Sequence, residues 1–142
     1  MAFPSRSEYE QLLYDLANSY PQITRSTLTL YTTSPLTGVV EGSIVLENGL
    51  ELRIAEALDF KNSRIQRYSY TVFRDGQKVR WYDAQPHPEL PELSSTFPHH
   101  RHELPDPKNN RRPAPGITFD SPNLPALIAD CIELARDLQS EP

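Results

Sequence analysis

The chain is poor in cysteine and glycine and has no long apolar run, and each shortage excludes a class of protein. Its 142 residues include one cysteine, Cys131, so no disulfide can form within the chain. The five glycines form no glycine-rich phosphate loop. No stretch has the length and apolar character of a signal peptide or a membrane span. We therefore expect a cytoplasmic protein with no membrane contact.

Size and composition predict one globular domain that spans residues 1–142. Hydrophobic residues make up 37% of the chain and charged residues 23%, which are ordinary shares for a folded domain. Proline is in excess at 14 residues, and most of it follows residue 85. Since proline fixes φ and lacks an amide donor, residues 85–122 are expected to form a long irregular segment that is rich in proline and histidine.

Hydrophobic periodicity predicts a helix at each end of the chain. Residues 7–18 carry apolar side chains at helical intervals, with Ser7 as the cap and Glu10 three residues later. Residues 123–139 carry a second apolar stripe, with a proline in the first turn.

Between the helices the period changes from 3.6 to 2. Residues 25–84 alternate apolar and polar side chains and contain the turn pairs Asn48-Gly49 and Asp75-Gly76, which predict an antiparallel meander of about five strands. The predicted fold class is therefore α+β.

The hairpin at Asp75-Gly76 also predicts which side chains share a face of the sheet. Counting outward from a two-residue turn places Val72 opposite Val79 and Tyr70 opposite Trp81. This apolar face is expected to lie under the helices. The other face, which is expected to be wetter, carries Arg67, Thr71, Lys78, Arg80 and Tyr82.

All four histidines fall within sixteen residues, as His87, His99, His100 and His102. Imidazole titrates nearest neutral pH and is also the commonest transition-metal ligand, so the grouping indicates proton transfer or metal binding. The spacing matches no closed structural zinc pattern, and prolines interrupt the segment. We therefore expect no metal and no other cofactor.

Charge is unevenly distributed along the chain, whose net charge is −5. Residues 61–112 hold ten Lys and Arg against six acids, a net +4, and the remaining residues hold four against thirteen, a net −9. Local charge decides where a polyanion docks, so the basic segment could face phosphate. Acidic side chains of the two predicted helices offer a surface to a basic partner or to a second copy of the chain, and these are Glu8, Glu10, Asp15, Asp130, Glu133, Asp137 and Glu141.

Two functions of different classes follow from these residues. The first is a metal-independent ribonuclease in which His99 and His100 exchange protons and His87 and Asp83 orient them. RNA would be held by basic, imidazole and aromatic side chains, namely Arg80, Arg101, His102, Arg67, Tyr68, Tyr70 and Tyr82. The second is a protein-interaction module without catalysis, whose histidine segment is structural.

Three stretches of the chain resemble the TumE family of small bacterial toxins. They are IQRYSY at residues 65–70, RWYDAQPHPE at 80–89 and TFPHHRHE at 96–103, and the last is the most specific. The resemblance covers roughly residues 25–105 and a similar C-terminal helix. It implies a toxin of a toxin-antitoxin pair, with a helix-turn-helix antitoxin as partner. The acidic helix surface leaves a homodimer as a further option.

Two positions depart from the family pattern. Ala84 stands where the family commonly has asparagine, and Pro88 where it commonly has a second histidine. If both positions belong to a catalytic set, the resemblance implies an attenuated activity.

Overall fold

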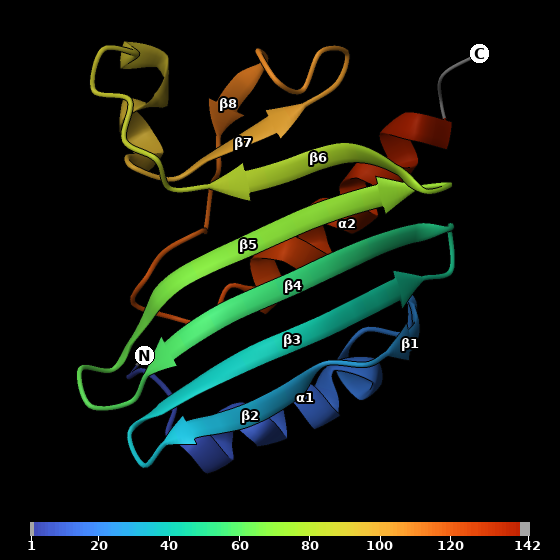
Figure 1. Cartoon of the computed structure of the whole chain (residues 1–142). Coiled ribbons are helices and arrows are strands. Elements are labelled where there is room, and N and C mark those ends of the chain that lie inside the picture. Colours follow the sequence, from blue (N-terminus) through green and yellow to red (C-terminus); the bar gives the residue numbers. More distant parts are fainter. Residues whose placement is uncertain (1, 140–142) are drawn as a thin grey trace.

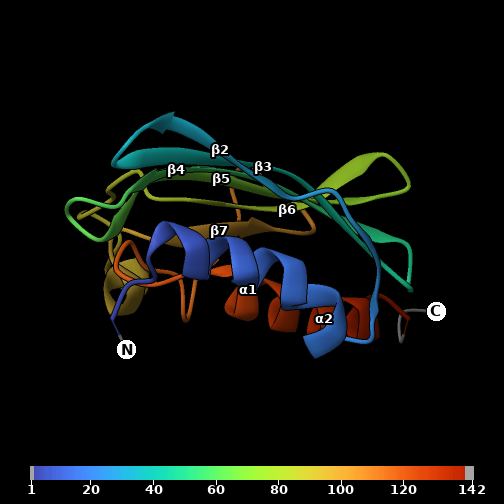
Figure 2. The ribbon, with the colours of Figure 1, turned by 90° about the horizontal axis from the view of Figure 1, so that it is seen from below.

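The computed structural model describes residues 2–139 and shows one antiparallel sheet of eight strands with two helices (Figure 1). Both helices lie on the same side of the sheet, which leaves its other face open (Figure 2). The elements are α1 (Arg6–Ser19), β1 (Ile23–Ser26), β2 (Thr29–Ser34), β3 (Thr37–Leu46), β4 (Leu50–Asp59), β5 (Arg64–Arg74), β6 (Gln77–Asp83), the 3-10 helix η1 (Pro91–Thr96), β7 (His100–Glu103), β8 (Arg111–Pro113) and α2 (Leu124–Gln139). The α+β class is confirmed, although the number of strands exceeds the prediction.

Helix α1 begins one residue before its predicted start, and its cap is Ser5 rather than Ser7. The Ser5 hydroxyl accepts a hydrogen bond from the Glu8 amide at 3.3 Å, and the Glu8 carboxylate accepts one from the Ser5 amide at 2.9 Å. Ser5 and Ser7 each precede a glutamate by three residues, and the prediction chose the wrong serine. The pair that forms satisfies two amide donors that the start of a helix leaves without partners.

Strands β2 to β6 form the predicted five-stranded meander, and the sheet also contains β1, β7 and β8. On one side, β1 and β2 both pair with β3. On the other side, β7 pairs with β6 and β8 pairs with β7. Residues 85–122 were predicted to be irregular, but η1, β7 and β8 lie within this range. The run of residues 99–103 contains no proline, so its amides are free to pair with β6.

The hydrophobic core lies between the sheet and the two helices. Helix α1 contributes Tyr9, Leu13 and Leu16, and α2 contributes an apolar stripe that includes the fully buried Cys131. No helix within residues 2–139 is long and apolar enough to cross a membrane.

The β5–β6 hairpin turns where predicted, but its register changes at Val79. Asp75 and Gly76 have φ values of 51° and 80°, the left-handed conformation that a tight hairpin turn requires. Lys78 pairs with Phe73, whereas Arg80 pairs with Val72, which leaves Val79 as the extra residue of a β-bulge.

The bulge reverses the predicted faces of β6. Arg80 and Tyr82 point toward the helices, whereas Trp81 and Asp83 point to the open face. The predicted register was wrong beyond Lys78, because counting from the turn assumes an unbroken alternation.

A buried chain of hydrogen bonds ties both helices to the sheet. Glu56 of β4 accepts a hydrogen bond from the Tyr9 hydroxyl of α1 at 2.6 Å and another from the Tyr70 hydroxyl of β5 at 2.5 Å. Asn123, which precedes α2, donates to the Tyr70 hydroxyl at 3.0 Å. Burial raises the pKa of the Glu56 carboxyl, and the two tyrosine hydrogen bonds only partly oppose this shift.

We expect Glu56→Gln to stabilise the protein increasingly, relative to wild type, as pH rises. The folded protein binds the Glu56 proton more tightly than the unfolded chain, so this stability is complete below the unfolded pKa near 4.5 and is lost as pH rises through the folded value. Glutamine keeps a polar group between the tyrosines and does not ionise. The test is the free energy of unfolding in urea, measured from about pH 4.5 to pH 8.

The matched control is Glu51→Gln, which removes a carboxylate from the same strand without changing the core. A constant difference between Glu56→Gln and wild type across this pH range would contradict the prediction.

Candidate functional site

Three of the four histidines gather with Asp83 on the open face of the sheet. Asp83 ends β6 and pairs with His100 of β7, and Trp81 pairs with His102. Because partners across an antiparallel ladder project to the same face, Asp83, His100 and His102 become neighbours. The segment that follows β6 brings the His87 ring to 5.1 Å from the His100 ring, measured between centroids. We call these four residues the open-face cluster.

Asp83 lies between the two imidazoles of β7. One carboxylate oxygen, Oδ1, is 3.3 Å from Nε2 of His100, and the other, Oδ2, is 3.3 Å from Nε2 of His102. The side chains of His100 and His102 are 1% and 7% exposed, whereas that of Asp83 is 38% exposed. Solvent therefore reaches the cluster through the carboxylate.

The outer nitrogens of both imidazoles are held by the backbone. Nδ1 of His102 donates a hydrogen bond to the Pro107 carbonyl at 2.7 Å, and Nδ1 of His100 donates to the Pro98 carbonyl at 3.3 Å. Trp81 stacks on the His102 ring with 4.7 Å between centroids and 16° between planes. Burial lowers the pKa of His100.

His87 occupies the rim of the cluster. Its Nδ1 lies 3.0 Å from the Glu89 carboxylate, and its side chain is 15% exposed. It is the most exposed of the three clustered histidines.

His99 lies on the opposite, helix-facing side of the sheet, away from the cluster. Its Nδ1 is 2.6 Å from the Tyr68 hydroxyl, and its ring packs against Phe119 with 4.6 Å between centroids. Burial lowers the pKa of His99 and raises that of Tyr68. The structure therefore separates His99 from His100, the two residues that were predicted to act as a pair.

Arg80 and Arg101, which were predicted to bind phosphate, form ion pairs beneath the sheet. Asp130 of α2 accepts from Arg80 at 2.8 Å and from Arg101 at 2.7 Å, and the Tyr82 hydroxyl also donates to Asp130. Glu103 pairs with both arginines, at 3.2 and 2.8 Å. These contacts join β6 and β7 to α2 and favour a structural role for the two guanidinium groups.

Sequence reasoning placed Asp130 on an acidic surface, but its side chain is only 17% exposed. The sequence does contain a sign that Asp130 is partly buried. It lies three residues after Leu127 and four before Leu134, on the buried side of the helix. Glu141, which was assigned to the same surface, lies outside the described residues.

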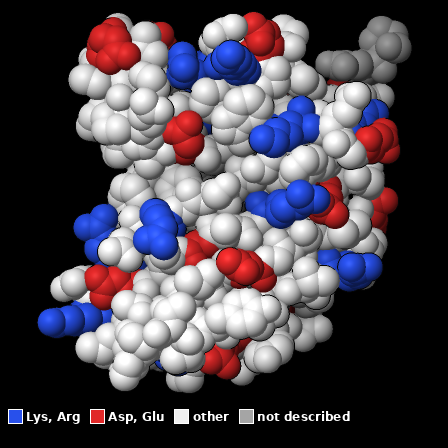
Figure 3. Space-filling model, viewed as in Figure 1, with Lys and Arg blue, Asp and Glu red and all other residues white. Residues whose placement is uncertain are grey.

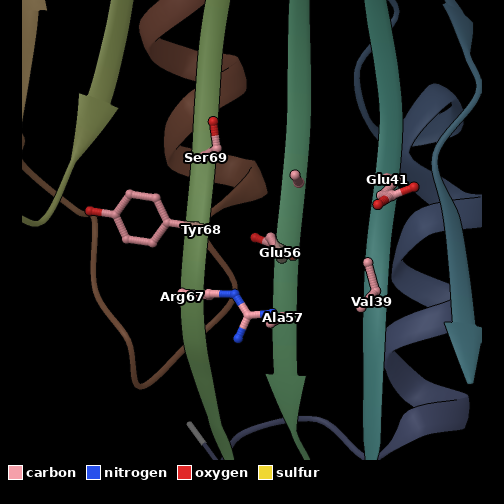
Figure 4. A pocket seen from close by; sticks show the side chains of 8 residues that line it. Val39, Glu41, Glu56, Ala57, Arg67, Tyr68 and Ser69 are labelled. Atoms are coloured by element: carbon pink, nitrogen blue, oxygen red, sulfur yellow. The ribbon is translucent and has the colours of Figure 1, made fainter. Parts of the chain in front are cut away.

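The tyrosines predicted to stack on bases are largely withdrawn from the open face. Tyr70 and Tyr82 are buried, and Tyr68 stacks on Tyr70 with 4.5 Å between centroids. Arg67 is exposed on the open face beside a shallow depression of about 280 Å³ above Ala55 and Ala57 (Figure 4). Figure 3 shows this face as a mixture of basic and acidic side chains, with a hollow at one margin.

We expect Asp130→Ala to lower the free energy of unfolding by about 2–4 kcal/mol, because it leaves two partly buried guanidinium groups with Glu103 as their one acidic partner among residues 2–139. Urea unfolding monitored by circular dichroism measures this change. The control is Glu133→Ala on the exposed side of the same helix, for which about 0.5 kcal/mol or less is expected. Equal effects of the two substitutions would show that the ion pairs do not hold β6 and β7 to α2.

Comparison with protein families identifies the family of the chain. The family model described as Toxin TumE matches residues 11–135, a range that includes the sheet, the open-face cluster and most of both helices. Comparisons with curated proteins and with solved structures give no significant match. The match confirms the resemblance seen in the sequence, and the chain belongs to the TumE toxin family.

Proposed function

We propose that the chain is a toxin that cleaves RNA and that the open-face cluster is its active centre. The observation that carries the proposal is the convergence of Asp83, His87, His100 and His102 from two strands and a connecting segment. Membership in a toxin family supports a damaging activity, and imidazoles beside a carboxylate are suited to proton transfer at a phosphodiester.

Exposure divides the cluster into two kinds of group. His100 and His102 are too buried to touch a polynucleotide directly, so they are positioning residues. Asp83 and His87 are the members that a bound RNA reaches. Arg67 lies on the same face and would contact the phosphate backbone.

The chemistry is transfer of the phosphoryl group to the neighbouring ribose hydroxyl. The 2′-oxygen forms a bond to phosphorus, the bond from phosphorus to the 5′-oxygen breaks, and one proton moves from the 2′-hydroxyl to the leaving oxygen. His87 is assigned to this proton transfer, because it combines access with a hydrogen bond to Glu89 that orients its ring.

A protein-interaction module without catalysis is the second candidate. The hydrogen bonds from His100 and His102 to the Pro98 and Pro107 carbonyls favour it, since they brace the proline-rich segment. In this alternative, substitutions in the cluster lower stability and leave RNA unchanged.

For the partner, we propose an antitoxin of the helix-turn-helix class that contacts the acidic side of the helices. Glu8, Glu10 and Asp15 of α1 and Glu133 of α2 lie at the surface, whereas Asp130 is engaged with Arg80 and Arg101. A DNA-binding partner carries basic side chains that would complement this charge.

Induction in a bacterial host tests the ribonuclease proposal. We expect the wild-type chain to arrest growth and degrade RNA, and His87→Gln and Asp83→Asn to reduce cleavage of RNA by purified protein about 100-fold or more. The matched control is His99→Gln, which removes a histidine from the opposite face and is expected to keep most of the activity.

Soluble yield and thermal midpoint are recorded for every variant, so that loss of folding is not mistaken for loss of catalysis. Intact RNA in cells that the wild-type chain has arrested would overturn the ribonuclease proposal. Full activity of His87→Gln would overturn the role given to that residue.

A further inference from the structure

We propose that Asp83, His100 and His102 form a binding site for one divalent transition-metal ion of the zinc class. The inference goes beyond RNA cleavage, because the arrangement of the ligand atoms carries it whatever the reaction is. It also reverses the expectation, drawn from the histidine spacing, that no metal binds.

The hydrogen bonds of the two imidazoles fix which nitrogen faces Asp83. A backbone carbonyl can only accept, so Nδ1 of His100 and Nδ1 of His102 both carry the proton that Pro98 and Pro107 receive. In a neutral imidazole the Nε2 atom then presents a lone pair. Nε2 of His102 is also within hydrogen-bonding distance of Oδ2 of Asp83, at 3.3 Å. When both imidazoles are neutral, two lone pairs face the carboxylate, and such a set of acceptors suits a cation.

The spacing of these atoms suits a metal ion. A tetrahedron with metal-ligand distances of about 2.0–2.1 Å has edges of about 3.3–3.4 Å. Nε2 of His100 is 3.3 Å from Oδ1 of Asp83, and Nε2 of His102 is 3.3 Å from Oδ2, so the carboxylate presents one oxygen to each imidazole at this distance. One ligand atom from each of the three residues can be chosen so that all of them lie within 4.8 Å of one another.

His100 provides an independent sign that the site has an occupant. Its side chain is 1% exposed, and its Nε2 atom makes no hydrogen bond with any of the residues 2–139. Leaving a buried polar nitrogen unsatisfied destabilises the folded protein, because the nitrogen loses its hydrogen bonds to water. A metal-nitrogen bond removes this destabilisation.

The surroundings of the imidazoles are those of metal ligands. Histidines that bind metals commonly donate their second ring N–H to a carbonyl or carboxylate, which fixes the ring and strengthens the ligand. Both imidazoles do so here, and Trp81 further holds the plane of His102. Two imidazoles and one carboxylate suit Zn²⁺ and related divalent ions better than Mg²⁺ or Ca²⁺.

Three protein ligands leave a coordination position open, which is the pattern of catalytic rather than structural zinc sites. Solvent reaches the site at Asp83, whose side chain is 38% exposed, and His87 lies at the rim. A water molecule bound at the open position would lie where the proposed RNA substrate approaches.

Metal binding by the untagged, chelator-treated chain tests the inference in the absence of RNA. We expect titration calorimetry with Zn²⁺ to give one ion per chain, and Co²⁺ to give the visible absorption bands of a site with nitrogen and oxygen ligands. Asp83→Asn and His102→Gln should each weaken Zn²⁺ binding about 100-fold or more. His99→Gln, the matched control, should bind like wild type.

A second test needs no variant that could misfold. It is nuclear magnetic resonance of the imidazole nitrogens in the wild-type chain. Zn²⁺ should shift Nε2 of His100 and His102 while both Nδ1 atoms stay protonated. Protonation of Nε2 without any response to Zn²⁺ would overturn the inference, since a proton would then be the cation beside Asp83. Equal Zn²⁺ affinity of all variants would overturn it as well.

The ribonuclease proposal and the metal-site proposal can be overturned independently of each other. A chain that binds Zn²⁺ through these residues but leaves RNA intact keeps the metal site and loses the ribonuclease. A chain that cleaves RNA but binds no Zn²⁺ in the titration keeps the ribonuclease and loses the metal site.

Discussion

The bulge at Val79 determines which side chains of β6 point to each face of the sheet. Without this extra residue, Asp83 and Trp81 would face the helices, and Arg80 and Tyr82 would face solvent. With it, the carboxylate that completes the open-face cluster reaches the same side of the sheet as the imidazoles of β7. One inserted residue therefore sets the chemistry of both faces.

The two faces of β6 and β7 depend on each other. On the helix side, Asp130 holds Arg80 and Arg101 and so fixes β6 and β7 against α2. On the open side, the same pairing of strands places the ligand nitrogens of His100 and His102 beside Asp83. The ion pairs under the sheet thus support the geometry above it, although none of their members belongs to the cluster.

Sequence periodicity predicted the elements that a single chain segment determines by itself. Both helices lie within one residue of their predicted limits, because their apolar stripes repeat over three turns or more. Strands β7 and β8 were missed, since a four-residue strand and a three-residue strand between prolines have too little alternation to detect. Their existence depends on the edge of β6, which lies 17 or more residues earlier in the chain.

The sequence by itself determined the α+β class, the limits of the helices, the hairpin turn at Asp75-Gly76 and the family, because each depends on local propensity or on a contiguous motif. It also located the segment that holds the candidate site. Only the tertiary structure decided that His100 joins Asp83 while its neighbour His99 joins Tyr68 on the other face. Adjacent residues of an extended chain point to opposite faces, and the strand pairing and the bulge decide which face each one occupies.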